Sequence, residues 1–527
     1  MRLQHALSAL SAAILGAALG LAQAAGGCAS IVGADFEDRT LQTCAVCTTT
    51  LFGPCSAGCM NGGVCDPQIL PAIEDCDTAE VDESCDALSA CQGNMLEAAS
   101  FGDPSEQQSA RVAVDGVGNT LLMVEASGAV NYGAGKISGT GLLNIHLVKL
   151  SADWDHLWSI ALTGGTDHRI GGIATDADNN ILVSGAFAGS MAIGDAPLAG
   201  HGDGFFDAFV ARLTPSKESD WATAFTGPNH ALVTALEVDP EGNIVVLGWF
   251  IDSLTIGGTA MTSAGSVDFY VAKLAPDGTA LWARAFGSLY EDWPWGLAVG
   301  PGGEIAVTGF FQISSAIGDL PLTGDADSYN GFVAALDKDG APVWSRALTS
   351  TEDSRGVDLT IDPEGRVLAT GAFAGELDFG TGPLTSGGLA DVFLAAYRLT
   401  DGEALWSRRY GDAEHQVGIA VEVDERGEVL LAGSAAGIIS FGPGTPMPAV
   451  DQDPFVVKLA PSTDAGPGEP RWSKRFTGTG AQAALGVAPD TLGNVIVAGT
   501  MTDLLTVGET VLDHDGGSDI WAAKLQP

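Results

Sequence analysis

Cysteine is absent from most of this chain. All nine cysteines lie between Cys28 and Cys91, and the 436 residues that follow contain none. Basic residues are also scarce, since 23 lysines and arginines stand against 66 aspartates and glutamates, for a net charge of −43. A surface this acidic serves solubility, and it repels nucleic-acid phosphates and anionic lipid headgroups. We therefore expect no nucleic-acid partner, while cations, basic proteins and neutral glycans stay open.

Long apolar runs are missing after the N-terminus. The first residues carry Arg2, an uncharged run from Ala6 to Leu21, and the small-x-small sequence Ala22-Gln23-Ala24. This pattern predicts a signal peptide over residues 1–24, cleaved after Ala24, with retention as a membrane anchor as the alternative. No later segment is apolar for 18 residues. The sequence therefore predicts an exported protein, secreted or held at the cell surface or outer membrane of a bacterium.

Catalytic signatures are missing as well. The chain contains no Gly-x-Ser-x-Gly, no phosphate-binding Gly-Lys-Ser/Thr loop and no His-Glu-x-x-His. Asp176-Ala177-Asp178-Asn179-Asn180 begins like a calcium loop but occupies an ordinary turn of the repeat described below. We assign no catalytic or cofactor-binding residues and do not expect an enzyme.

The cysteine-rich segment spans residues 25–93. In an exported protein such a small segment reads as a disulfide framework, because it cannot build a sufficient core alone. A zinc site is the alternative for the Cys-x-x-Cys and Cys-x-x-x-Cys spacings, but no histidine lies in this stretch. We assign eight cysteines to disulfides of undetermined connectivity: Cys44, Cys47, Cys55, Cys59, Cys65, Cys76, Cys85 and Cys91.

The ninth cysteine, Cys28, is left over. It follows Ala25-Gly26-Gly27, which resembles a bacterial lipoprotein box, although such boxes prefer Leu where Ala25 stands. Cys28 is therefore a candidate for lipidation, with ordinary secretion as the alternative. A lipid on Cys28 is the one membrane attachment that we expect for the cleaved protein.

Residues 94–527 repeat one pattern seven times. Each unit has an apolar strand, a turn that opens on Asp, and a second apolar strand that ends in Gly. The turn positions lie 61, 63, 61, 62, 62 and 66 residues apart. They are Asp115, Asp176, Asp239, Gly300, Asp362, Asp424 and Asp490. A repeat of short strands at this length predicts one closed ring of β-sheets.

Each unit supplies four strand signals. The second strand ends in Gly in every repeat but the first, where we place Glu125. An excursion with a Phe-Gly or Ile-Gly pair then leads to strand three, which follows Asp or Asn, and a hairpin leads to strand four. A tryptophan marks strand four six times, and we expect it to pack between neighbouring sheets. These residues are Trp158, Trp221, Trp282, Trp344, Trp406 and Trp472.

The seventh repeat ends before its fourth strand. Residues 96–103 near the N-terminus align with 405–412, except that Glu97 replaces the tryptophan. An N-terminal strand that completes the last sheet would close the ring and remove an exposed edge. We therefore predict an all-β, seven-bladed β-propeller closed by an N-terminal strand and preceded by a small disulfide-rich segment.

The combined motifs resemble a known family. The Asp-x-x-Gly-Asn turn, Val-x-Gly-x-Phe, Phe-Gly, Asp-x-Phe-Val-Ala-Lys-Leu and Leu-Trp-Ser-Arg-x-Phe-Gly together resemble the bacterial seven-bladed β-propeller repeats of the SBBP type, common in secreted and surface proteins of myxobacteria. The resemblance covers residues 95–527 and leaves out the cysteine-rich segment. The resemblance implies the fold and an extracellular location, and it implies no activity.

Polar residues precede each turn position by eight or nine residues, in the loops where propellers bind ligands. They are Gln107, His168, His230, Asp292, Asp353, His415 and Gln482. If the histidines and carboxylates converge, they would suit a transition metal. The candidate metal ligands are His168, His230, Asp292, Asp353 and His415, although solvated loop tips are polar anyway.

A second polar set lies just before strand three. Calcium is one interpretation of these oxygens in an exported protein. Capping of the local turn by the Asp or Asn side chain explains them more simply. The set is Asn144, Asp207, Asp268, Asn330, Asp391, Asp453 and Asp519.

Together these observations predict a monomeric, non-catalytic binding or scaffold protein that presents a rigid acidic propeller to a protein or glycan ligand. No cofactor is expected beyond calcium or a transition metal. The alternative is a secreted propeller enzyme with a metal or polar site at the channel mouth.

Overall fold

The computed structural model describes residues 59–60, 64–65, 93–194, 196–202, 204–442, 446–449 and 451–527. The chain divides into two units, Met1–Asn94 and Met95–Pro527. In the first unit, β1 (Cys59–Met60) pairs antiparallel with β2 (Val64–Cys65). The predicted signal peptide, Cys28 and six of the eight cysteines assigned to disulfides lie outside the described residues, whereas Cys59 and Cys65 stand opposite each other in the register of β1 and β2.

The second unit is built of four-stranded antiparallel sheets, and the secondary structure of the described residues is entirely β. No described helix is long and apolar enough to cross a membrane. Sheet 1 holds β4 (Gln107–Val114), β5 (Thr120–Ala126), β8 (Asn144–Leu150) and β9 (His156–Ala161). Sheet 2 holds β11 (Asp167–Thr175), β12 (Ile181–Ala188), β15 (Phe206–Leu213) and β16 (Ser219–Phe225). Sheet 3 holds β17 (Ala231–Val238), β18 (Ile244–Ile256), β19 (Thr259–Leu274) and β20 (Ala280–Phe286).

The remaining sheets repeat this order. Sheet 4 holds β21 (Asp292–Val299), β22 (Ile305–Gln312), β25 (Tyr329–Leu336) and β26 (Pro342–Leu348). Sheet 5 holds β27 (Ser354–Ile361), β28 (Arg366–Phe373), β31 (Asp391–Arg398) and β32 (Ala404–Tyr410). Sheet 6 holds β33 (Gln416–Val423), β34 (Val429–Ala435), β37 (Asp453–Leu459) and β38 (Pro470–Arg475). Sheet 7 holds β40 (Gln482–Pro489), β41 (Val495–Met501), β44 (Asp519–Leu525) and, from the start of the unit, β3 (Met95–Phe101).

The excursion between strands two and three folds into a small hairpin. In sheet 3 the long strands β18 and β19 carry this hairpin themselves, and elsewhere short strands form it. These are β6 (Ala129–Asn131), β7 (Lys136–Ser138), β13 (Ser190–Ile193), β14 (Ala196–Ala199), β23 (Ser314–Ile317), β24 (Leu320–Thr323), β29 (Glu376–Asp378), β30 (Pro383–Thr385), β35 (Ile438–Ile439), β36 (Met447–Pro448), β42 (Leu505–Val507) and β43 (Thr510–Leu512). Two short strands from the loops before inner strands, β10 (Thr163–Gly164) and β39 (Thr477–Gly478), pair with such hairpins at β13 and β42.

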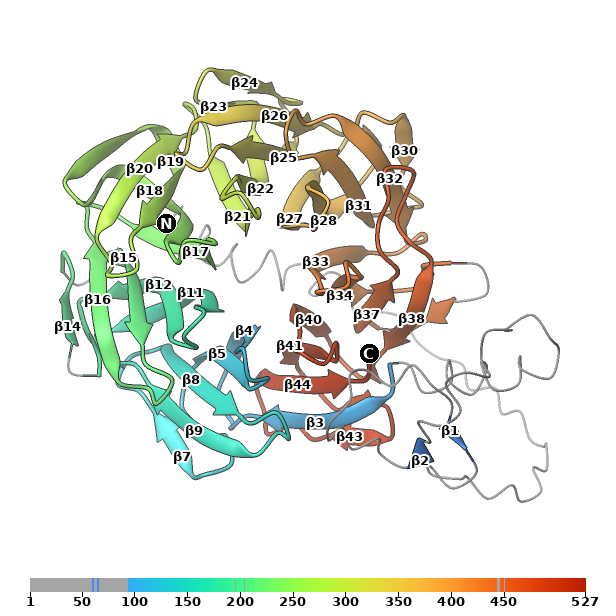
Figure 1. Cartoon of the computed structure of the whole chain (residues 1–527), viewed down its shortest axis with the longest axis horizontal. Coiled ribbons are helices and arrows are strands. Elements are labelled where there is room, and N and C mark those ends of the chain that lie inside the picture. The colour runs from blue at the N-terminus through green and yellow to red at the C-terminus, as the bar shows by residue number, and fades with distance from the viewer. Residues whose placement is uncertain are drawn as a thin grey trace. The chain divides into compact units, whose positions relative to one another are not determined.

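The sheets follow one another around a common centre, with the first strand of each sheet innermost (Figure 1). Each inner strand contacts the next in the order β4, β11, β17, β21, β27, β33 and β40, and β40 contacts β4. Strands two and three are central in each sheet and are buried on both faces, so they read as near-continuous apolar runs. This is the arrangement of a β-propeller.

Hydrophobic clusters form between adjacent sheets. One cluster joins Leu182 and Ala208 of sheet 2 to Phe250 and Tyr270 of sheet 3, all of them buried. Another joins the two ends of the unit, because Phe101 packs with Ile520 and with residues of sheet 1. The core is therefore a series of layers between sheets.

The strand-four tryptophans pack between sheets, as predicted. The indole N–H of Trp221 donates to the carbonyl of Pro276 in the next sheet's hairpin at 3.0 Å. Trp344 makes the same bond to Leu399 at 2.7 Å. Beneath Trp344 the hairpin residue is Gly402, with φ +69, where an added Cβ would lie 2.5 Å from the ring. These contacts fasten each sheet to the next one.

The junction between sheets 7 and 1 lacks a strand-four tryptophan and is filled by another aromatic ring. In β3, Glu97 pairs with Lys524, as Trp472 pairs with Lys458 in sheet 6. The next hairpin, in sheet 1, carries Trp154 with φ +65 at the position where sheets 3, 4 and 5 carry Gly278, Gly340 and Gly402 and where sheet 2 carries Lys217 with φ +70. Trp154 packs against the cluster between sheets 7 and 1. The aromatic ring thus comes from the other partner at this junction.

The Asp that opens each turn serves the fold. Its Oδ1 accepts backbone N–H groups two and four residues on, as in Asp239 with Glu241 at 3.0 Å and Asn243 at 2.7 Å. Its Oδ2 pairs with a buried strand-three cation, Lys273, at 2.6 Å. Lys273 Nζ also reaches the carbonyl of Lys338 in the next sheet at 3.3 Å. The turn, the sheet and the neighbouring sheet are therefore joined at one ion pair.

One predicted position is wrong. Val124, which pairs with Ala110, occupies the level held by Gly185 in sheet 2, so Glu125 lies one residue beyond the glycine position. The interval from the turn agrees with this register, because Gly185 lies nine residues after Asp176 and Val124 lies nine residues after Asp115.

Candidate functional site

The predicted polar residues lie at one end of the second unit. The loops that lead into the inner strands bond there to the segments before strand three: Leu142 donates its N–H to Thr166 at 2.8 Å, and Gln416 donates to Ala390 at 2.7 Å. We call this end the mouth face. Its loops are 102–106, 162–167, 226–230, 287–291, 349–353, 411–415 and 476–481, and its segments are 139–143, 200–202, 204–205, 263–267, 324–329, 386–390, 449, 451–452 and 513–518.

The first predicted ring is only partly one structural level. Four of the residues are structurally equivalent, because each pairs with the residue that lies two positions after the strand-two Gly, or after Val124 at that position in sheet 1. These four are Gln107, His168, Asp292 and Gln482. In the other sheets this level is held by Ala231, Ser354 and Gln416. His230, Asp353 and His415 each lie one residue earlier, ahead of the paired strand. The spacing to the turn position agrees with this register, since the equivalent residues all lie eight residues before the turn and these three lie nine before it. Grouping the two spacings together combined two structural levels.

Residues at this level hold their own loops in place. Gln416 donates to Asp412 Oδ1 at 2.8 Å and to the carbonyl of Ala436 at 2.7 Å, and its amide oxygen accepts the N–H of Asp412 at 3.2 Å. His168 is fully buried, and its Nδ1 lies 2.9 Å from the carbonyl of Leu143. The second nitrogen of His168, Nε2, is buried without a partner.

The candidate metal ligands are not brought together. The part of the chain that the structure describes contains no group of three or more His, Cys, Asp or Glu side chains placed to hold a metal ion. Asp292 and His168 are buried, His230 is nearly so, and Asp353 is exposed. Asp353 Oδ1 accepts the N–H of Tyr329 at 3.0 Å.

The second predicted set caps the loops before strand three. Asn330 accepts the N–H of Asp325 at 2.8 Å, Asp391 that of Gly387 at 2.6 Å, and Asp519 that of Asp515 at 2.7 Å. Asp453 instead accepts the N–H of Gly478 at 3.2 Å. All seven side chains are buried. Turn capping, the simpler interpretation, accounts for their placement.

Burial changes the acidity of several of these groups. Desolvation raises the pKa of Asp292 to about 7, although the Ser288 hydroxyl and backbone N–H lower it. Desolvation raises the pKa of Asp453 to about 6 against the charge of Arg475. The pKa values of His168 and His230 are lowered by burial. Burial thus favours the neutral forms of both residue types.

A charged cluster on the inner strands was missed by the sequence reasoning. Arg111 of β4, Glu237 of β17, Asp358 of β27 and Glu422 of β33 interact electrostatically. Burial and the charge of Asp358 raise the pKa of Glu237 to about 8. Burial, Glu237 and Asp358 raise the pKa of Glu422 well above its usual range. No local signal groups these residues, since they come from four sheets.

An aromatic group near the mouth face was also missed. Trp293 lies 5.2 Å from Trp249 and 6.5 Å from Phe310 between ring centroids. The guanidinium of Arg355 sits over Phe310 at 5.3 Å and over Tyr329 at 5.0 Å. The Trp293-Pro294-Trp295 stretch, which departs from the other repeats, is the sequence signal for this group.

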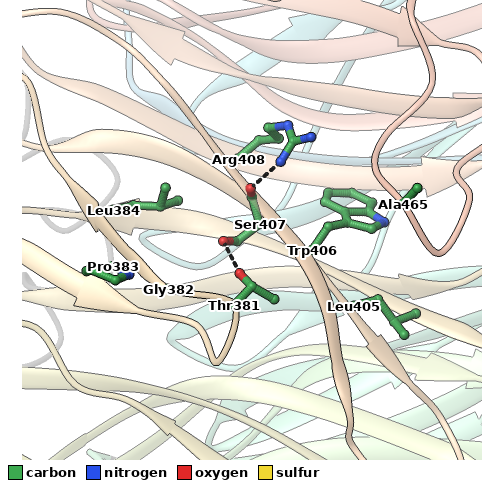
Figure 2. Close-up of a pocket in the computed structure, with 9 residues that line it drawn as sticks. All are labelled: Thr381, Gly382, Pro383, Leu384, Leu405, Trp406, Ser407, Arg408 and Ala465. Carbon is green, nitrogen blue, oxygen red and sulfur yellow. Dashed lines mark hydrogen bonds between the residues drawn. The ribbon is translucent and has the colours of Figure 1, made fainter.

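Two shallow hollows lie at equivalent positions of two different sheets. One, of about 360 Å³, lies beside the outer strand β32, and its lining includes Thr381, Trp406 and Arg408 (Figure 2). Thr381 and Ser407 share a hydrogen bond of 2.8 Å across it. The other, of about 470 Å³, is lined by Trp158 and its surroundings in sheet 1. These hollows follow from the repeat rather than from one specialised blade.

Comparison with known proteins supports the fold class alone. No protein-family model matches the chain. An uncharacterized WD repeat-containing protein, L264 of Acanthamoeba polyphaga mimivirus, is 21% identical over 454 residues, which is 70% of this chain and 32% of the viral protein. The chain thus spans about a third of the length of that curated relative.

Three solved structures that are similar to this chain all give TM-scores below 0.5. A protein of unknown function from Dyadobacter fermentans gives a TM-score of 0.40 at 11% identity, over 82% of this chain and 98% of its own. YCF48 bound to D1 peptide gives 0.39 at 9% identity, over 83% and 98%. Quinohemoprotein alcohol dehydrogenase from Comamonas testosteroni gives 0.37 at 11% identity, over 83% and 77%. At these TM-scores the likeness carries no argument about function.

Proposed function

We propose that the seven sheets are the blades of a single closed β-propeller of the SBBP type. The cyclic contacts of the inner strands and the pairing of β3 with β44 support this proposal. The pairing of β3 with β44 supplies sheet 7 with the outer strand that each of the other sheets takes from its own repeat. The protein would then be a rigid disk whose loops are free to vary.

We propose that this disk is a non-catalytic binding or scaffold protein. The observation that carries the proposal is that the repeated polar residues are used by the fold. The turn Asp, the strand-three Asp or Asn, and the Gln of the inner strand bond to their own loops. What remains accessible and variable is the exposed part of the mouth face, where ligands would bind.

A ligand screen tests this function. The full chain would be applied to glycan, peptide and metal-ion panels, with binding followed by calorimetry. We expect at least one saturable ligand whose affinity falls when exposed mouth-face residues are changed and stays unchanged when the opposite turns are changed. Turnover of a substrate with no dependence on mouth-face binding would contradict the proposal.

An enzyme with a polar or metal site at the mouth is the second candidate. The buried, unpartnered Nε2 of His168 and the raised pKa of Asp292 favour it. Elemental analysis and activity panels on the His168→Ala, His230→Ala and His415→Ala variants would test it. Bound metal at one equivalent, lost in these variants, would support the enzyme over the scaffold.

We further propose that the protein is exported as a monomer and that disulfides stabilise its cysteine-rich segment. A lipid on Cys28 would be one means of attachment to the cell surface. Non-reducing mass spectrometry of the natural protein would locate the disulfides and any diacylglycerol. Free thiols throughout the cysteine-rich segment, or an unprocessed N-terminus in the cytoplasm, would contradict the proposed export. Light scattering would report the oligomeric state.

A further inference from the structure

The mouth face has an unusual charge. Its loops and segments contain no lysine or arginine, although the chain carries 23. They do carry exposed carboxylates, including Asp325, Asp327, Glu352, Glu414 and Asp451. The opposite end is mixed, because Lys217, Lys338 and Arg426 are exposed on its turns. Two other carboxylates of these loops, Asp167 and Asp353, have arginine partners on the inner strands, Arg169 and Arg355. The excess of acidic charge at this end is therefore carried by the exposed carboxylates named above.

The same face exposes apolar side chains. Leu142 and Leu289 are 77% and 75% exposed, Leu389 is 59% exposed, and Phe205 and Tyr290 are each 38% exposed. Three of these residues lie at equivalent positions of three different sheets, two residues before the strand-three Asp or Asn: Leu142, Phe205 and Leu389. The side chains that hold the loops are buried, so these apolar groups are not needed for the fold. Exposed apolar groups among charges are typical of protein-binding surfaces.

We infer that the mouth face binds a basic, partly apolar segment of another protein, an inference that rests on the binding function proposed above. Lysine or arginine on the partner would meet the unopposed carboxylates, and apolar side chains would cover Leu142, Leu289 and Leu389. Charge disfavours the other occupants. A second copy would bring the same acidic face, and residues 1–94 carry 11 acidic against 2 basic residues.

The test compares two ends of one molecule. The full chain would be titrated with a synthetic lysine–leucine peptide and with the same peptide carrying serine for leucine. The mouth variant is Asp327→Asn/Glu352→Gln/Glu414→Gln. Its matched control at the opposite turns is Asp178→Asn/Glu241→Gln/Glu425→Gln, which removes the same charge from exposed residues.

We expect saturable binding of the lysine–leucine peptide, weakened about tenfold by the mouth variant and little by its control. Binding should weaken between about 50 and about 300 mM NaCl. A Leu142→Ser/Leu289→Ser/Leu389→Ser variant should bind the lysine–leucine peptide no better than the serine peptide. Equal weakening by both charge variants would show nonspecific attraction and overturn the inference.

The outcomes also separate this inference from the proposed function. If neither peptide binds while a glycan or other panel ligand does, the basic partner is wrong and the binding function stands. If no ligand binds and the chain turns over a substrate, the binding function itself fails. Circular dichroism of each variant would verify that the fold is retained.

Discussion

At the scale of residues, the junction between sheets 7 and 1 explains how the repeat tolerates a departure. Glu97 stands at the tryptophan position of strand four, and Trp154 stands at the glycine position of the facing hairpin. At three other junctions the order is reversed, because Trp221, Trp282 and Trp344 lie against the hairpin glycines Gly278, Gly340 and Gly402. One ring fills the space in each case, because two would clash and none would leave a void.

This exchange predicts a rescue. Trp154→Gly should lower the free energy of unfolding by about 2 kcal/mol, because a partly buried aromatic ring leaves a cavity. The double variant Glu97→Trp/Trp154→Gly restores the usual arrangement and should recover at least half of that loss. Urea unfolding of the two variants and of Glu97→Trp alone measures the coupling. Additive effects would mean that the two positions do not share one space.

At the scale of elements, a buried ion pair joins the turn to strand three in several sheets. Lys149, Lys273, Lys458 and Lys524 pair with the turn Asp of their own sheets at 2.6 to 3.0 Å. Sheet 4 lacks both partners, since Gly300 replaces the Asp and Ala335 replaces the Lys. Sheet 5 has Ala396 instead of the Lys, and Arg366 pairs with Asp362. The turn Asp of sheet 5 thus keeps a cation although its lysine is missing, and in sheet 4 both partners are missing together.

Breaking one such pair should be costly. Asp239→Asn should reduce the free energy of unfolding by about 3 kcal/mol, because Lys273 stays buried without its counter-charge. Burial raises the pKa of Asp239, but the bonds from Lys273 and Asn243 outweigh it and leave that pKa below its usual value. The stability from this carboxylate is therefore present above pH about 4 and is lost on acidification. Thermal melts of Asp239→Asn beside the control Glu241→Gln, on the same turn, would measure the difference, and equal melting temperatures would contradict the prediction.

At the scale of the whole molecule, the inner strands bring like charges from distant repeats together. Glu237, Asp358 and Glu422 come from three sheets, and Arg111 of a fourth is the cation that interacts with Asp358. Their mutual repulsion is a cost of closing the acidic sheets around one centre. This cost depends on pH, since protonation of the carboxyls relieves it.

The sign of the pH dependence follows from the raised pKa values. The folded chain holds protons on Glu237 up to about pH 8, whereas the unfolded chain releases them near the ordinary value. The folded state therefore binds more protons in that window, and stability falls as the pH rises from about 5 to about 8. Glu237→Gln and Glu422→Gln should each reduce this fall in melting temperature, while the exposed control Glu425→Gln should not. If the dependence of the melting temperature on pH were unchanged in both variants, these carboxyl groups would not interact.

Local sequence signals were sufficient for the strands. Alternation, glycine turns and the repeat interval predicted four-stranded antiparallel sheets and the packing role of the tryptophans, because these features are set by neighbours in the chain. They were not sufficient for the levels of the mouth residues. His230, Asp353 and His415 lie nine residues before their turns and His168 lies eight before its own, and strand pairing shows that this difference of one residue places them on another level.

The sequence by itself determined that this protein is a repeated all-β propeller with a strongly acidic surface, since strand pattern and net charge need no tertiary information. The tertiary structure decided which polar groups the fold consumes and which remain exposed. It placed the strand-three carboxylates in loop caps and the inner-strand carboxyls of separate sheets near one another. It also collected the lysine-free loops at one end. The reason is that residues far apart in the chain meet only when the sheets pack around a common centre.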